Sequence, residues 1–187
     1  MSVTAAPPPV ITPPKRRGIG VTIALVVVLG AVVVVGGIGA AIVRPALLRA
    51  RMSANEASAI SSLRMINIAQ AAYAASCGAE VYAVSLNDLA KPPAGSSVGF
   101  LPTDLATNDV VKAGYRFRVE AVPGAVSVAA AGPCSGAVAG YFAAAEPVTL
   151  GETGTRFLST DAGGKVYGSQ SPIANPLRPS PSVTLLP

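Results

Sequence analysis

Histidine and tryptophan are absent from this chain of 187 residues, and aromatic residues make up only 5% of it. Without histidine, the sequence lacks the commonest general base and the commonest metal ligand. Its two cysteines, Cys77 and Cys134, are too few for a cysteine-only zinc site. Serine, lysine and acidic residues occur in the loops without any catalytic spacing. We therefore expect no enzyme activity and no catalytic, cofactor-binding or metal-binding residues.

Acidic residues are absent before Glu56. The cations that precede it are Lys15, Arg16, Arg17, Arg44, Arg49 and Arg51. These cations flank a long apolar run on both sides, where lysine and arginine side chains meet anionic lipid headgroups. The formal net charge of +5 therefore indicates a membrane as partner and disfavours nucleic acid.

Polar residues are nearly absent from the run itself, in which Thr22 is the main exception. About 25 apolar residues, at a helical rise of about 1.5 Å each, exceed the roughly 30 Å of bilayer hydrocarbon. We predict a transmembrane helix over residues 18–44. Pro45 follows directly and would kink the helix near the membrane surface.

Residues 1–17 are rich in proline and alanine and end in three cations, which predicts a disordered cytoplasmic tail with a basic flank. The cations stand directly before Gly18 and allow two interpretations. One is proteolytic processing after Gly18, and the other, which we favour, is a positive flank on an uncleaved anchor. A cleaved secretory signal is disfavoured because its apolar region spans only about 7 to 15 residues.

Residues 45–168 are predicted to form one small α+β domain. Positions 46–76 contain no glycine or proline and favour a helix over 45–76. The larger apolar side chains of this helix recur at separations close to multiples of 3.6 residues and predict an apolar stripe that needs a partner surface: Leu48, Met52, Leu63, Ile66 and Tyr73. A loop over 77–112 and an antiparallel sheet of about four strands over 113–168 follow. In the sheet, Tyr115, Phe117 and Val119 alternate with charged residues, which is typical of a half-buried strand. One sheet face would bury the helix, and the Pro/Ser-rich tail 169–187 is expected to be loosely ordered.

The state of Cys77 and Cys134 depends on where this domain resides. Outside the cytoplasm a disulfide between them is expected, and it would stabilise the fold by about 4 kcal/mol. The alternative is a pair of unbonded, buried thiols.

The segment from Gly37 to Cys77 resembles type IV pilins and the major pseudopilins of bacterial type II secretion. In that family the apolar helix ends in a Gly-Ile-Leu-Ala-Ala-Ile-Ala-Ile-Pro type of sequence, which corresponds here to GIGAAIVRP at 37–45. Two further segments are similar to pilin-type domains: LLRARMSANEASAISSLR, which follows closely, and GTRFLSTDAGGKVYG at 154–168. The similarity is most specific over the helix.

The resemblance implies a pilin-like α+β fold, in which one half of a long N-terminal helix lies in the membrane or filament core. Its other half packs on a four-stranded antiparallel sheet, often with a disulfide. It implies a subunit held in the bacterial inner membrane, with its N-terminus cytoplasmic and its C-terminal domain periplasmic or extracellular, which polymerises through the helix. Partners would be other pilin-like subunits, a prepilin peptidase that cleaves after Gly18, and the pilus or secretion machinery.

Small residues in the apolar run are candidates for helix–helix assembly: Gly36, Gly37 and Ala40, with Pro45 at the end. The spacing from Gly36 to Ala40 lets two helices approach closely. The alternative is the ordinary glycine content of a membrane helix.

Three features depart from the family pattern. Family members carry a glutamate a few residues into the mature chain, whereas no acid precedes Glu56 here. Arg44 stands where the family usually has an aliphatic residue. Counting back from Pro45 with the family's helix spacing puts the start of the mature chain near Ala24, several residues after the candidate cleavage at Gly18. We therefore keep a second functional hypothesis, a non-polymerising, membrane-anchored binding or scaffold module derived from a pilin.

Overall fold

The computed structural model describes residues 18–77, 81–93, 95–128, 134, 137–178 and 180–187. Within 18–44 it describes side-chain exposure only for residues 20 and 24–27. The predicted tail 1–17 lies outside the described residues. The chain divides into two compact units, Met1–Ala46 and Leu47–Pro187.

The first unit contains the beginning of helix α1, Gly18–Cys77, which continues through Pro45. The described leucine and valine side chains of this unit are exposed, with Leu25, Val26 and Val27 each at 64–70%. Among the described residues, no helix meets the combined length and hydropathy that a membrane crossing requires. The predicted span falls largely on positions whose side chains lie outside the described set, so it stays a prediction.

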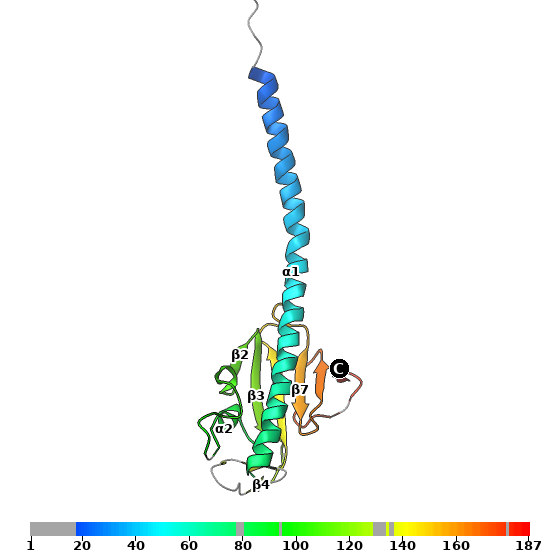
Figure 1. Ribbon diagram of the computed structural model, residues 1–187. Coiled ribbons are helices and arrows are strands. Elements are labelled where there is room, and N and C mark those ends of the chain that lie inside the picture. The colour runs from blue at the N-terminus through cyan, green and yellow to red at the C-terminus, as the bar shows by residue number, and fades with distance from the viewer. Residues whose placement is uncertain (1–17, 78–80, 94, 129–133, 135–136, 179) are drawn as a thin grey trace, which may run out of the picture. The chain divides into compact units, whose positions relative to one another are not determined.

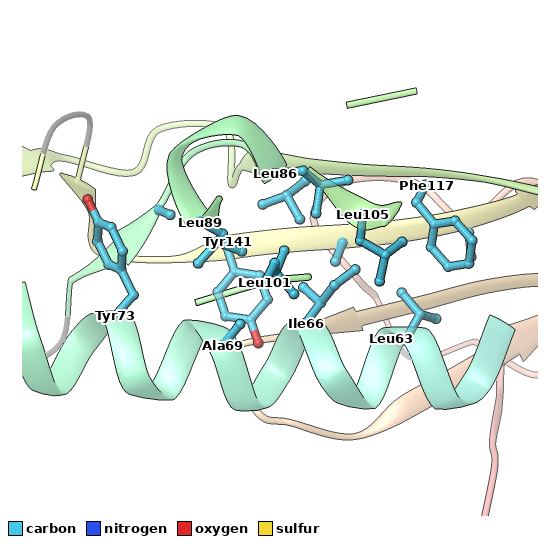
Figure 2. Packing of buried hydrophobic residues seen from close by; sticks show 14 of the residues in the cluster. Leu63, Ile66, Ala69, Tyr73, Leu86, Leu89, Leu101, Leu105, Phe117 and Tyr141 are labelled. Carbon is cyan, nitrogen blue, oxygen red and sulfur yellow. The ribbon is translucent and has the colours of Figure 1, made fainter. Parts of the chain in front are cut away.

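In the second unit, α1 packs on an antiparallel sheet (Figure 1). The helix buries Ala59, Leu63, Ile66 and Tyr73 at separations of three, four and seven residues, the repeat of one helix face. Figure 2 shows Leu63, Ile66, Ala69 and Tyr73 pointing from the helix toward Leu86, Leu105, Phe117 and Tyr141. These side chains form the core of the unit.

The main sheet has, among the described residues, six strands in the order β2-β3-β6-β7-β8-β9, and each pairs with its neighbours antiparallel. Their bounds are β2 Val110–Lys112, β3 Tyr115–Ala121, β6 Tyr141–Pro147, β7 Phe157–Asp161, β8 Val166–Ser169 and β9 Thr184–Leu185. A smaller sheet joins β1 Tyr82–Ala83, β5 Ala137–Val138 and β4 Ser127–Val128 in the order β1-β5-β4. The packing of helix on antiparallel sheet confirms the α+β prediction, whereas the number of strands in the sheet was underestimated.

The strands β3 and β6 form the centre of the main sheet. They pair over their whole length, from Tyr115 opposite Pro147 to Ala121 opposite Tyr141. As the alternation predicted, Tyr115, Phe117 and Val119 are buried on the helix side. Nearly every residue of β6 is buried, as befits a central strand with neighbours on both edges.

The predicted loop over 77–112 contains the short helical turn that SLNDLAKPP at 85–93 favours, and further elements that the sequence did not indicate. Helix α2, Leu86–Leu89, begins after Ser85, whose side chain accepts a hydrogen bond from the Asp88 backbone N–H. A 3-10 turn at Thr103–Leu105 and strand β2 follow. Strand β2 was missed because it has three residues and gains its partner through a tight turn at Ala113 and Gly114, both with positive φ.

The C-terminal tail is fastened to the sheet rather than loose. Strand β9 pairs with β8, placing Leu185 opposite Tyr167. Leu186 donates its backbone N–H to the Val166 carbonyl at 2.9 Å, and the Asn175 side chain donates to the Ala121 carbonyl at 3.0 Å. The proline content that suggested disorder is compatible with order here, because hydrogen bonds to β8 and to the Ala121 carbonyl hold the tail in place beside local bonds such as Val183 N–H to the Ser180 carbonyl.

Candidate functional site

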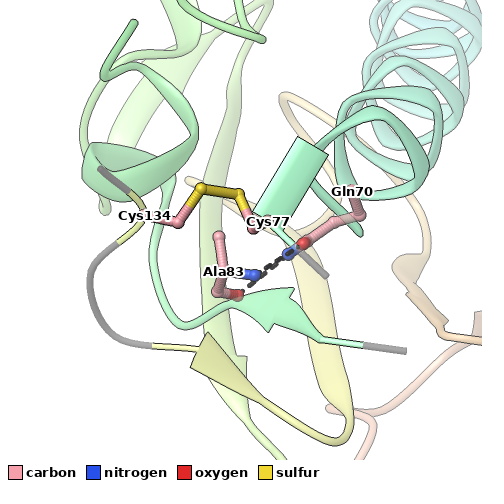
Figure 3. The surroundings of a disulfide bond; sticks show 4 residues. All are labelled: Gln70, Cys77, Ala83 and Cys134. Carbon is pink, nitrogen blue, oxygen red and sulfur yellow. Dashed lines mark hydrogen bonds between the residues drawn. A yellow bond between two sulfur atoms is a disulfide. The ribbon is translucent and has the colours of Figure 1, made fainter. Parts of the chain in front are cut away.

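Two polar side chains on the inward face of α1 fix the helix to the sheets. Gln70 is fully buried, and its amide both donates to the Ala83 carbonyl at 3.0 Å and accepts from the Ala83 N–H at 2.9 Å (Figure 3). A buried amide is favourable only when its donors and acceptors are paired. Gln70 therefore ties α1 to strand β1.

Asn67 makes a second attachment, to the main sheet. Its side-chain oxygen accepts from the Tyr141 hydroxyl at 2.9 Å and the Thr160 hydroxyl at 3.1 Å, and its nitrogen donates to the Gly164 carbonyl at 3.0 Å. Burial raises the pKa of Tyr141 far above its usual value, with further contributions from Tyr82 and Asp161. The hydroxyl therefore stays protonated and able to donate.

The predicted cysteine pair lies at the end of α1. Cys77 and Cys134 form a disulfide with their Cα atoms 5.7 Å apart, a usual separation for this bond (Figure 3). Cys77 is 1% exposed and belongs to the core, and Cys134 packs against that core. Of the two states that the sequence allowed, the structure has the disulfide.

Glu56 forms a third link between α1 and the sheet, and the sequence analysis did not predict it. The carboxylate is 7% exposed and accepts from Nε and Nη2 of Arg156, which precedes β7, and from the Thr155 hydroxyl at 3.1 Å. A buried carboxylate needs such partners because desolvation of an unpaired charge is costly. Glu56 lies on the same helix face as the buried Ala59 and Leu63. Its place on this face is the sequence feature that could have predicted its burial.

The backbone around Arg156 is held by Tyr115. The Tyr115 hydroxyl donates to the Arg156 carbonyl at 3.0 Å. Burial, together with the nearby Glu56 charge, raises the pKa of Tyr115 to about 12. Gly154 approaches the same ring so closely that a Cβ there would overlap the phenol oxygen. The position of Arg156 thus depends on Gly154 and on Tyr115, whose burial the alternation predicted but whose hydroxyl contact with Arg156 it did not.

A groove opens beside this ion pair. It has a volume of about 570 Å³, and its residues come from α1 on one side and from the positions just before β7 and just after β8 on the other. The lining residues are Arg49, Met52, Ser53, Glu56, Ala57, Ile60, Thr155, Arg156 and Gln170. The groove therefore combines two guanidinium groups with apolar side chains.

The outward face of α1 in the second unit carries small and apolar side chains. Ile68 is 71% exposed, Leu47 48% and Met65 38%. The exposed small residues of this face are Ala54, Ala57, Ser61, Ala71, Ala72 and Ala75. Exposed apolar side chains on a helix are a feature of surfaces that another helix or a lipid covers. We call this set the outward face of α1.

The other residues predicted for assembly lie on the first part of α1. Gly18 is the first residue of the helix, and Gly36, Gly37 and Ala40 lie within it, although their surroundings are outside the described set. Pro45 is helical and exposed. Cleavage after Gly18 and helix contacts at these positions stay predictions.

No family model, curated protein or solved structure matches the chain. Likeness to a characterised protein therefore assigns no function, and the pilin resemblance rests on the residues quoted above. In the part of the chain that the structure describes, no cluster of three or more cysteine, aspartate or glutamate side chains is placed to hold a metal ion.

Proposed function

We propose that the chain is a pilin-like subunit of a type IV pilus or of a type II secretion pseudopilus. In this proposal residues 18–44 hold it in the bacterial inner membrane, and α1 drives polymerisation. The observation that carries the proposal is the two-sided α1. One face is fastened to the sheet by apolar and polar contacts, and the outward face leaves apolar side chains exposed.

The energetics favour association through α1. Burying a side chain such as Ile68 or Leu47 stabilises a contact by about 1.5 to 3 kcal/mol each. Small residues such as Ala71 and Ala75 let a second helix approach closely. Leu25, Val26 and Val27 in the first unit are likewise exposed and would be covered by lipid or by neighbouring subunits.

The disulfide supports the proposed location. Disulfides persist in oxidising compartments such as the bacterial periplasm and are rare in the cytoplasm. The Cys77–Cys134 bond therefore favours a domain that faces the periplasm or the cell exterior, with the basic N-terminal tail on the cytoplasmic side.

The amount of chain recovered in sheared surface filaments tests this function. Ile68→Asp would bury a charge in every subunit contact, so we expect recovery to fall at least about tenfold. Val126→Asp is the matched control, since Val126 is equally exposed, at 70%, but belongs to the segment before β4 and not to α1. Equal recovery of both variants, or no chain in the filaments of wild-type cells, would rule the proposal out.

A second function is favoured by the absence of any acid before Glu56 and by Arg44. It is a non-polymerising, membrane-anchored extracytoplasmic binding or scaffold module. The intact mass of the membrane-extracted chain separates the two. A chain that begins at Ile19 or Val21 supports processing and the filament, whereas retention of residues 1–18 supports the anchored module.

A further inference from the structure

We propose that the groove beside Glu56 binds the phosphate headgroup of an anionic phospholipid, with Arg49 and Arg156 as its cationic ligands. The two arginines come from distant parts of the chain, one from α1 and one from the residue before β7, and both line the groove. Guanidinium groups suit phosphate because their planar N–H donors match two of its oxygens.

Both arginines have donors to spare. The Glu56 carboxylate accepts hydrogen bonds from Nε and Nη2 of Arg156. The arginine side chain is still 39% exposed, so its remaining N–H groups are free to bind a ligand in the groove. Arg49 is exposed and forms no ion pair with any residue that the structure describes. The positive charge of Arg156 compensates the negative charge of Glu56. The net charge of the groove lining is therefore +1, and it comes from Arg49.

The remainder of the groove favours a lipid over a small anion. Met52 and Ile60 add apolar side chains to the lining, along which the first carbons of an acyl chain can lie. A neighbouring hollow of about 320 Å³ shares Arg156 and Gln170 and includes Ser169, Ser171 and Ser182 in its lining. Serine hydroxyls can pair with the glycerol headgroup of phosphatidylglycerol, which is therefore the probe of choice.

The inference rests on the membrane anchor of the proposed function but not on polymerisation. Arg49 lies five residues after Arg44, the end of the predicted span, so the sequence keeps this part of α1 near the lipid surface. If binding came only from general attraction to anionic headgroups, Arg49 and Arg51 would contribute equally to it. A built site distinguishes them, because Arg51 does not line the groove.

The experiment uses the full chain in a nonionic detergent, with its methionine methyl groups labelled with carbon-13 for NMR. Met52 lines the groove, whereas Met65 lies on the outward face of α1 and serves as an internal control. Titration with short-chain phosphatidylglycerol should shift the Met52 signal to saturation and leave Met65 in place. Arg49→Gln should weaken this binding about tenfold, and Arg51→Gln by less than about twofold.

Two further titrations identify the ligand. Short-chain phosphatidylcholine has the same tails without net charge, and inorganic phosphate has the anion without the tails; both should shift Met52 only weakly. The proposal is overturned if either one matches phosphatidylglycerol, if Met52 does not move, or if the two arginine variants bind equally. Because this titration needs no filaments, binding by a chain that is absent from sheared filaments would contradict the proposed polymerisation alone.

Discussion

Glu56 shows at the scale of one residue how α1 is held to the sheet. Its carboxylate meets Arg156 and Thr155, which lie about a hundred positions further along the chain. Removal of one partner from such a pair leaves the other with an uncompensated charge. The arginine is partly exposed, so solvent screens much of the interaction and moderates this cost.

We expect Glu56→Gln to lower the free energy of unfolding by about 1 to 2 kcal/mol, because the neutral amide keeps its shape but loses charge-assisted bonds. Urea unfolding of the detergent-solubilised chain, followed by circular dichroism, measures this. Glu152→Gln is the control, since Glu152 is an exposed loop residue. The ion pair has no stabilising role if both variants unfold at the same urea concentration.

At the scale of elements, α1 has one buried side and one exposed side. Leu63 is fully buried against the core, and Ile68, five residues later, is 71% exposed. We expect Leu63→Ala to cost about 2 to 5 kcal/mol through lost contacts and a cavity. Ile68→Ala should cost less than about 0.5 kcal/mol in the isolated chain. Thermal unfolding of both variants checks the assignment, and a large loss from Ile68→Ala would show that the outward face is packed within the monomer.

Periodicity predicted the inward side of α1 well but not where it begins. Leu63, Ile66 and Tyr73 were expected in the apolar stripe and are buried. Leu48 was expected in the same stripe and is 47% exposed, since sequence spacing does not reveal where the sheet stops covering the helix.

Pairings between distant segments were harder to predict. Strand β9 has two residues, Thr184 and Leu185, which is too short to show an alternating pattern in the sequence. It forms because it pairs with β8. The Glu56–Arg156 pair and the double hydrogen bond of Gln70 to Ala83 depend in the same way on tertiary placement. The alternation of β3, by contrast, was read correctly because seven consecutive residues carry it.

At the scale of the whole molecule, the disulfide fixes the end of α1 to the region of the small sheet. Cys77 and Cys134 are 57 positions apart. Replacement of both by serine should lower the free energy of unfolding by about 4 kcal/mol, because a loop of this length regains its freedom in the unfolded chain. Alkylation without reductant is the companion measurement. Two readily labelled thiols in the protein taken from its native membrane would contradict both the bond and the extracytoplasmic location.

The central claim is that copies of the chain associate through the outward face of α1. The most direct measurement places a photo-crosslinking amino acid at Ile68 or, as a control, at Val126, and irradiates intact cells that produce the full chain. The account predicts a ladder of crosslinked copies from position 68 and almost none from position 126. Monomer alone at position 68, or equal ladders from both positions, would contradict it.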